Sequence, residues 1–282
     1  MLGIHNGDCL EVIKDISDNS VDLIFCDLPY GQTNCKWDTC IDLDLLWEQI
    51  KRVRKRGCPI FFTTTTKFGV NLINSNPKEF RYDLVWVKSA TTGFLLAKKM
   101  PMRKHEMVYV FYDFLPYYDI SSHTAVGTWV EEKKTTAKKG GCYAYSKPTP
   151  HKKYDPPLPS SVITFTKKDK DFRCPGGVYG NDIIQHGNGG KSLKYDPPLP
   201  TSIVEIKSTR GKHSTEKPVE LINWILKYYS KEGDIVLDPT MGCGSTGMAC
   251  KQMGRKFIGI EYDKDIFYIA EQRLKGNKIK VY

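Results

Sequence analysis

The sequence predicts an α/β fold in which a doubly wound, mostly parallel sheet is interrupted by one inserted region. Short apolar runs that end in an acidic residue alternate with segments of helical periodicity in residues 1–112 and 201–282. A glycine-rich loop follows one of these runs and opens a helix, which is typical of ligand-binding loops in parallel sheets. Residues 113–200 lack this alternation. We therefore expect 1–112 and 201–282 to form one domain and 113–200 to form an insert.

Composition restricts the class of protein before any motif is considered. The chain has 282 residues, with 42 Lys and Arg against 32 Asp and Glu, and a net charge of +10. This surplus indicates a polyanionic partner. The nine cysteines form no C-x-x-C pair, which predicts reduced thiols. No run approaches the roughly 18 apolar residues of a membrane span, and Met1 to Asp8 contain no apolar signal core. The sequence thus predicts a cytoplasmic protein and argues against a secreted disulfide scaffold or a membrane protein.

The first stretch supplies strands for the sheet. Residues 21–26 form a nearly continuous apolar run that ends at Asp27, which is typical of a strand buried on both faces. Residues 43–53 carry apolar side chains at helical spacing and end in a basic cluster. Further strands are predicted at 59–63, 84–87 and 107–111.

The last stretch repeats the pattern. A helix is predicted from Pro218 to Tyr229, because proline is favoured in a first turn. Only 35 residues follow Gly247, too few to complete a doubly wound sheet, so we expect N-terminal strands to complete it. The remaining elements predicted here are a strand at 235–237, a helix that ends near Met253, a strand at 257–260 and a helix at 265–274.

The insert differs from both flanking stretches. Between 131 and 200 there are 13 Lys and Arg against 7 Asp and Glu, a net charge of +6. The segment 153–163, Lys-Tyr-Asp-Pro-Pro-Leu-Pro-Ser-Ser-Val-Ile, recurs with small changes at 194–204. Each Pro-Pro pair favours extended backbone before a β-branched run. The repeat predicts a duplicated strand entry in a small β-rich region.

The glycine-rich loop runs from Asp238 to Gly247, Asp-Pro-Thr-Met-Gly-Cys-Gly-Ser-Thr-Gly, and contains G-x-G-x-x-G. Its place between a strand and a helix lets its backbone approach a ligand closely. Glu261 ends the next strand, where a carboxylate can accept both hydroxyls of a ribose. A nicotinamide enzyme would have the same pair, but Asp238 before the glycines suits a cationic ligand better than a pyrophosphate.

A second candidate site follows the strand at 21–26. The loop Asp27-Leu28-Pro29-Tyr30 lies at the carboxyl end of a strand, where open parallel sheets bind their ligands. The exocyclic amine of a nucleobase is a poor nucleophile, because its lone pair is delocalised into the ring. The Asp27 carboxylate and the Leu28 carbonyl could grip the two amine hydrogens and restore that lone pair. Tyr30 could stack on a base taken out of a duplex. An ordinary proline-containing turn is the alternative for these four residues alone.

Taken together, these segments resemble the DNA amino-methyltransferases that use S-adenosylmethionine. Asp238–Gly247 is similar to their D-P-F-x-G-x-G-[ST]-[ST]-x loop, with Met241 at the Phe position. Asp27–Tyr30 resembles their [DNS]-P-P-[YFW] motif, with Leu28 in place of the first proline. His213-Ser-Thr-Glu-Lys-Pro218 resembles H-P-T-[QE]-K-P, with Ser214 in place of a proline, and Gly7–Glu11 is similar to an N-terminal G-D-C-L-E segment. The order of catalytic loop, variable insert and cofactor loop resembles the β-group, which implies a Rossmann-like fold with a circularly permuted motif order.

The resemblance implies a role for each matching residue in catalysis. Asp27 and the Leu28 carbonyl, with Pro29 in the same motif, would hold the target amine, and Tyr30 would stack on the flipped base. The acidic form of the motif usually goes with adenine N6, and a Ser form with cytosine N4. Asp27 therefore favours adenine. Carbon-5 cytosine methylation is disfavoured, because the sequence has no Pro-Cys dipeptide.

The resemblance also implies the residues around S-adenosylmethionine. Glu261 would bind its ribose, Asp8 and Cys9 would lie beside its adenine, and Thr215 and Lys217 would edge the pocket. The methionine part would be cradled by Asp238, Gly242 and Gly244, and the other cofactor contacts expected in that loop are Pro239, Thr240, Ser245 and Thr246.

The insert 113–200 corresponds to the family's target-recognition region, whose lysines would contact DNA phosphates. The DNA contacts expected from charge are Lys98, Lys99, Arg103 and Lys104 in a cluster before the insert and Arg173 within it, and Asn181, Gln185 and Asn188 are further candidates for base readout. The spacings of Cys142, His151, Cys174 and His186 match no usual zinc site, so no metal is expected.

The sequence therefore predicts a site-specific adenine-N6 methyltransferase acting on double-stranded DNA by base flipping. Cytosine-N4 methylation, and a nucleic-acid-binding relative that has lost catalysis, remain alternatives. A nicotinamide oxidoreductase is a more distant one. The sequence leaves open the recognition site, a homodimer and a cognate restriction nuclease of a restriction-modification system.

Overall fold

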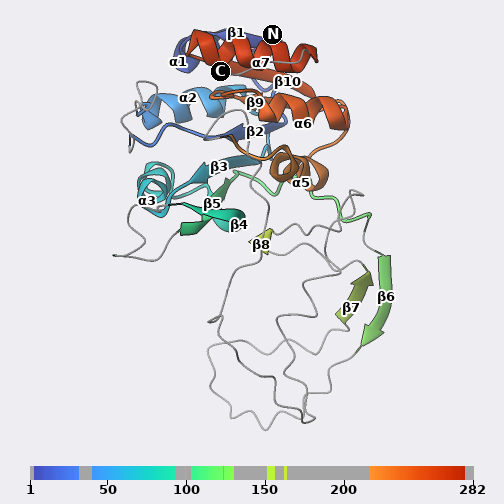
Figure 1. Ribbon diagram of the computed structural model, residues 1–282. Helices are drawn as coiled ribbons and strands as arrows, with labels where there is room; N and C mark the ends of the chain where they lie inside the picture. Colours follow the sequence, from blue (N-terminus) through green and yellow to red (C-terminus); the bar gives the residue numbers. More distant parts are fainter. Residues whose placement is uncertain are drawn as a thin grey trace. The chain divides into compact units, whose positions relative to one another are not determined.

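The central sheet explains how two distant parts of the chain form one fold. A computed structural model describes residues 3–31, 40–92, 99, 103–122, 124–129, 151–155, 162–163 and 216–276. Within these residues, eight strands form one sheet in the order β1-β10-β9-β2-β3-β5-β4-β8 (Figure 1). The strands are β1 (Gly3–Asn6), β10 (Lys256–Glu261), β9 (Ile235–Asp238), β2 (Leu23–Cys26), β3 (Ile60–Thr64), β5 (Arg103–Phe111), β4 (Phe80–Thr92) and β8 (Val162–Ile163).

Strand direction confirms the predicted fold class. The pairs from β1 through β10, β9 and β2 to β3 are parallel, whereas β5 is antiparallel to both of its neighbours. At the centre, Leu23 of β2 lies opposite Val236 of β9, and Ile24 lies opposite Leu237. The N-terminal strands therefore complete the sheet begun by the C-terminal stretch, as expected.

Helices connect and cover these strands. The helix α2 spans Leu43–Val53, the predicted range, and the Asp42 carboxylate caps its first turn. The helix α3 and the strand β1 were not predicted, and β4 is longer than expected. The other helices are α1 (Cys9–Val12), the short 3-10 helix Ile13–Asp15, α3 (Thr66–Ser75), α5 (Val219–Tyr229), α6 (Ser245–Met253) and α7 (Lys264–Lys275).

The strand β3 shows that the sheet is buried on both faces. Phe62 packs edge-on against Trp47 of α2, with ring centroids 5.5 Å apart. Its neighbour Phe61 points to the other face and packs against Tyr229 of α5 at 5.0 Å. Both phenylalanines are almost fully buried. A continuous apolar strand is what such a two-sided position requires.

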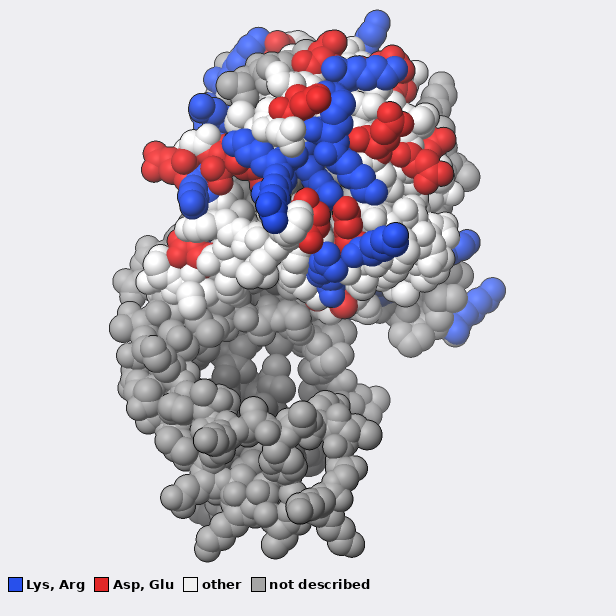
Figure 2. All heavy atoms as spheres, turned by 180° about the vertical axis from the view of Figure 1, so that it is seen from behind, with Lys and Arg blue, Asp and Glu red and all other residues white. Residues whose placement is uncertain are grey.

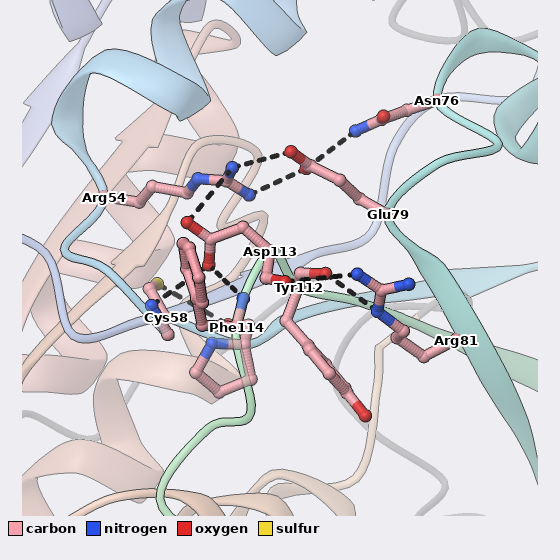
Figure 3. A network of polar contacts seen from close by, with 10 residues as sticks. Arg54, Cys58, Asn76, Glu79, Arg81, Tyr112, Asp113 and Phe114 are labelled. Atoms are coloured by element: carbon pink, nitrogen blue, oxygen red, sulfur yellow. Dashed lines mark hydrogen bonds and ion pairs between the residues drawn. The ribbon is translucent and has the colours of Figure 1, made fainter.

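A buried charge network closes the amino end of β3 (Figure 3). The Arg54 guanidinium makes two hydrogen bonds of 2.8 Å to the two carboxylate oxygens of Glu79. Asn76 donates a further hydrogen bond to Glu79, and Asp113 lies 3.7 Å from Arg54. Asp113 also accepts from the main-chain N–H of Gly57 and of Phe114. The network lies at the opposite end of β3 from the loop that begins at Asp27.

The chain divides into two units, of which the second spans 120–160 and 167–198. In that unit the described elements are β6 (Thr124–Trp129) and β7 (His151–Asp155), which pair in an antiparallel manner. In the first unit, β8 pairs with β4. The first copy of the predicted repeat, 153–163, contributes the last part of β7 and the whole of β8, and its second copy lies outside the described residues.

Surface charge in the first unit is largely mixed in sign. On the face in Figure 2, Lys and Arg side chains gather near the middle with Asp and Glu around them. The ion pairs of this unit include Arg52 with Asp18 and Lys55 with Asp22. The basic stretch 131–200 lies outside the described residues apart from β7 and β8. No helix in the described ranges combines the length and apolarity that a membrane crossing needs.

Candidate active site

A cavity of about 630 Å³ lies where β2, β9 and β10 end. Its size is within the usual range for small-molecule sites. It collects most of the residues expected at the catalytic and cofactor sites. These are Asp8, Cys9, Asp27, Leu28, Pro29, Tyr30, Lys217, Asp238, Pro239, Thr240, Gly242, Ser245, Thr246 and Glu261.

The glycine loop turns the chain sharply from β9 into α6. Gly242 and Gly244 have φ angles of 54° and 83°, a region that strongly favours glycine. Gly244 caps α6, and a Cβ there would lie 3.3 Å from the Cβ of Ala270 in α7. Gly244 therefore lets the loop pack closely against α7, while Gly242 lines the cavity.

Asp238 lies buried beneath this loop, only 2% exposed. Its carboxylate accepts a 2.5 Å hydrogen bond from the Thr246 hydroxyl and a 3.1 Å bond from the Thr240 N–H. Burial raises the pKa of Asp238 to about 7, and these two hydrogen bonds offset only part of the effect. The cavity wall thus holds a carboxyl group that a cationic ligand would convert to its anionic form.

Glu261 and Asp8 organise the wall beside the loop. One Glu261 oxygen accepts from the Gly242 N–H at 3.0 Å, and the other accepts from the Asp263 N–H at 2.8 Å. A carboxylate has about four acceptor positions, so Glu261 retains capacity for ligand hydroxyls. Asp8 accepts from the Leu10 N–H and begins α1. Burial raises the pKa of the neighbouring Cys9 thiol to about 12, so this group acts as an apolar surface.

Asp27 is the most heavily contacted group of the site. Its Oδ1 accepts from the Thr63 hydroxyl at 2.5 Å and lies 2.9 Å from the Tyr30 hydroxyl. Its Oδ2 accepts from the Lys217 amine at 2.5 Å. The Asp27 main-chain carbonyl accepts from the Thr240 hydroxyl at 3.1 Å, which joins this loop to the glycine loop. The carboxylate is therefore fixed in direction by groups from β3, its own loop and the segment before α5.

Leu28 and Tyr30 have different surroundings. The Leu28 side chain is 3% exposed and belongs to the apolar core. Its packing gives a physical reason for leucine where the motif has proline. The Tyr30 ring packs at a tilt against Phe68, with centroids 5.2 Å apart. The Tyr30 hydroxyl also lies 2.9 Å from the Thr63 carbonyl, and its single proton can serve only this carbonyl or Asp27.

Several expected residues are either outside the described ranges or away from the cavity wall. Thr215, Lys98 and Arg173 are outside the described residues. Lys99 lies exposed in a turn, whereas Arg103 and Lys104 lie at the start of β5. None of these three belongs to the described cavity wall.

The structure adds residues that the motifs did not identify. Thr63 and Glu106 come from β3 and β5, and Glu106 lines the cavity. Glu216 lies inside the His213–Pro218 motif, accepts from Arg273 of α7 at 2.5 Å and from Ser245 at 3.2 Å, and lines the cavity as well. Polar residues at the ends of the strands at 59–63 and 107–111 were the available signal for the first two.

Comparison with known proteins agrees with this arrangement. The Type II methyltransferase M2.DpnII of Streptococcus pneumoniae is 34% identical over 116 residues, 41% of this chain and 42% of that protein. M.HinfI of Haemophilus influenzae is 44% identical over 75 residues, 26% of this chain and 21% of that protein. The alignments thus span less than half of these relatives.

Solved structures share the fold over nearly the whole chain. The complex of M1.HpyAVI with SAM has a TM-score of 0.54 at 20% identity, covering 97% of this chain and all of that one. The cytosine-N4-specific PvuII DNA methyltransferase has a TM-score of 0.60 at 13% identity, covering 99% of this chain and 88% of that one. At these identities the likeness concerns the fold alone. The profile of the DNA methylase family, however, matches residues 21–272, and the chain therefore belongs to the N6/N4 DNA methylase family.

Proposed function

We propose that this protein transfers a methyl group from S-adenosylmethionine to the N6 amine of adenine in double-stranded DNA. The observation that carries the proposal is the shared cavity, into which both Asp27 and the glycine loop project. Family membership supports methylation of DNA. The relatives named Type II methyltransferases and the M1.HpyAVI complex with SAM support the reaction and the cofactor.

The residues of the cavity fit S-adenosylmethionine by their chemistry. When bound, this cofactor supplies an electrophilic methyl group on a sulfonium centre. Asp238, buried under the loop, would ionise and balance the positive charge of the ligand. Glu261 would accept from the ribose hydroxyls with its remaining lone pairs. Asp8 and Cys9 would lie beside the adenine, and Ser245 and Thr246 would extend the wall toward α6.

The target amine would be held by Asp27 and the Leu28 carbonyl. Each accepts one amine hydrogen, which draws the nitrogen toward tetrahedral geometry. As the nitrogen gained the methyl group, the sulfonium would leave as a neutral thioether. The Asp27 carboxylate would stabilise the positive charge on the nitrogen until its extra proton passed to solvent. The acidic motif favours adenine N6 over cytosine N4. Lys98, Lys99, Arg103, Lys104 and Arg173 would contact the DNA around the flipped base, with 113–200 as the recognition region.

The test is nucleoside analysis of DNA from a host that expresses the protein. Mass spectrometry should find N6-methyladenine, and long-read sequencing should place it in one recurring sequence. N4-methylcytosine instead would establish the alternative base. Cofactor binding without any methylated base would indicate an inactive relative.

Asp27→Ala provides the matched variant. It should abolish methylation while calorimetry finds cofactor binding unchanged, because Asp27 holds the amine and not the cofactor. Methylation that persists in this variant would contradict the role of Asp27.

A further inference from the structure

A line of alternating charges leads from the β4–β5 strand pair to Asp27. Lys88 of β4 forms an ion pair with Glu106 of β5. The other carboxylate oxygen of Glu106 lies 3.7 Å from the Lys217 amine, which in turn lies 2.5 Å from Asp27. The four side chains are 14%, 15%, 11% and 25% exposed, so solvent screens their charges only partly.

The contacts of Lys217 place it on the side of the cavity that holds Asp27. Both of its ion-pair partners are carboxylates, Asp27 and Glu106. The cofactor of the proposed function has a net positive charge, so near its sulfonium a lysine ammonium group is favourable only where carboxylates offset it. Burial alone would lower the pKa of Lys217, but the two carboxylates more than offset it and the pKa is raised. Lys217 therefore keeps its positive charge and pairs with the two carboxylates next to it.

Hydrogen-bond capacity indicates what Lys217 does to Asp27. On Oδ1, the Thr63 hydroxyl fills one acceptor position, and the Tyr30 hydroxyl lies within hydrogen-bond distance of the other. On Oδ2, Lys217 fills one. Since a carboxylate has about four positions, one remains on Oδ2, the oxygen that Lys217 orients. An amine hydrogen of the target base would therefore meet a carboxylate that is contacted by Thr63, Tyr30 and Lys217.

Glu106 affects the site through its negative charge next to Lys217. As the amine gains a methyl group its nitrogen becomes positive, and an unbalanced Lys217 close to Oδ2 would oppose that charge. The Glu106 carboxylate offsets Lys217, and its buried oxygen nearest Lys217 makes no hydrogen bond among the described residues. The contact between that oxygen and Lys217 is therefore electrostatic and not a hydrogen bond.

We propose that Lys217 is a positioning residue that aims the Asp27 carboxylate at the target amine, and that Glu106 balances its charge during methyl transfer. The inference rests on the proposed function, since it assigns Lys217 to the amine side of the cavity and not to the cofactor side.

The first test separates turnover from cofactor binding. Single-turnover methyl transfer to host-derived DNA, with cofactor saturating, is compared for wild type, Lys217→Met, Glu106→Gln and the double variant. Lys217→Met should slow transfer by about tenfold to a hundredfold, because the Asp27 carboxylate is no longer held in a fixed direction. Calorimetry with S-adenosylmethionine should find the dissociation constant changed by less than about threefold, because no cofactor contact is lost.

The double variant tests the charge-balancing role. Glu106→Gln removes one of the two carboxylates next to Lys217 and should slow transfer, whereas removal of both charges should give a faster rate than Glu106→Gln alone. A transfer rate within twofold of wild type in Lys217→Met would overturn the positioning role. So would a cofactor dissociation constant that rises by the same factor as the rate falls. A double variant slower than both single variants would overturn the role of Glu106.

A second readout does not depend on activity. Lysine-selective NMR follows the titration of the Lys217 amine, which faces Asp27 from the β2 loop and Glu106 from β5, with Lys88 of β4 beyond Glu106. Asp27→Asn and Glu106→Gln should each lower the pKa of Lys217, because each removes a neighbouring negative charge. An unchanged titration in both variants would refute the contact.

Controls keep the two hypotheses apart. Lys14→Met removes an exposed Lys–Glu pair and should leave rate, affinity and melting temperature near wild type. Melting temperatures of the site variants identify any that fail to fold. If a Lys217 or Glu106 variant does not fold, the titration of Lys217 in Asp27→Asn still tests the contact between Lys217 and Asp27. If wild type never methylates DNA but the Lys217 titration behaves as expected, the proposed function fails and the contact stands.

Discussion

The hydroxyl of Thr240 donates a hydrogen bond of 3.1 Å to the main-chain carbonyl of Asp27. It is a direct link between the loop expected to hold the cofactor and the loop expected to hold the target. Thr240→Val keeps the shape and removes the donor, which should cost about 1 kcal/mol of coupling and lower kcat severalfold. Thr240→Ser keeps the hydroxyl and should remain near wild type. Equal rates for the two variants in steady-state assays would show that the link has no role.

Cofactor affinity should depend on pH through Asp238. Burial raises the pKa of this carboxyl to about 7, so the free protein holds its proton below neutrality. A cationic ligand favours the ionised form, and affinity should therefore rise with pH and level off above about 7. Calorimetry across pH 5.5–8.5, in buffers of different ionisation enthalpy, measures both the rise and the proton release. Asp238→Asn should bind weakly at every pH and release no proton.

The same carboxyl should affect folding stability. Its pKa is raised on folding, so its stabilising contribution is fully present below about pH 4 and is lost as pH rises through about 7. The loss should be at most about 4 kcal/mol. Urea unfolding of wild type and Asp238→Asn at several pH values checks this, and the variant should have the flatter profile. Parallel profiles would assign the pH dependence to other groups.

The buried pair of Arg54 and Glu79 should matter for stability and not for the site. Both side chains are largely buried, and removal of one partner leaves an uncompensated charge. Glu79→Gln or Arg54→Met should destabilise the fold by about 3–5 kcal/mol. The exposed pair of Lys14 and Glu11 is the matched control and should contribute less than about 1 kcal/mol. Denaturant titration measures both, and cofactor affinity of the folded fraction should be unchanged.

Gly247 should tolerate no larger residue. An added Cβ would lie 2.8 Å from side-chain atoms of Leu274 and Phe257, so the contact between α6, α7 and β10 would have to open. Gly247→Ala should destabilise the fold by about 1–3 kcal/mol despite the better helix propensity of alanine. Lys264→Ala on the exposed side of α7 should change stability by less than about 0.5 kcal/mol. Similar melting temperatures for the two variants would contradict the packing argument.

Local patterns were sufficient where one segment carries its own signal. The helix Leu43–Val53 has apolar side chains at helical spacing and an aspartate cap, and it forms over the predicted residues. The helix Thr66–Ser75 contains glycine, asparagine and threonine, which are poor helix formers, and it forms because Phe68 and Leu72 are buried. The strand Gly3–Asn6 has no apolar run and depends on pairing with β10. These two elements require tertiary contacts that propensity does not encode.

The candidate site likewise contains residues that local motifs predict and residues that only the arrangement of the sheet brings in. The motif residues were found from spacing, and most of them line one cavity. Thr63 reaches the site because β3 lies parallel beside β2, with Phe62 opposite Cys26. Glu106 reaches it because β5 lies antiparallel beside β3, with Met107 opposite Thr64. Sheet order and register decide that placement, and neither is written in a local motif. The partners of Lys217 could not be predicted for the same reason.

The seam between β2 and β9 also determines when a newly made chain can acquire activity. Leu23–Cys26 and Ile235–Asp238 are adjacent in the sheet, yet more than two hundred residues separate them in the order of synthesis. At ribosomal speed, β2 waits roughly ten to forty seconds for this neighbour. During that time a fully apolar strand edge is unpaired in the nascent chain, which makes it a natural client for a chaperone. The proposed methyl transfer would therefore begin only after the last strands have closed the sheet.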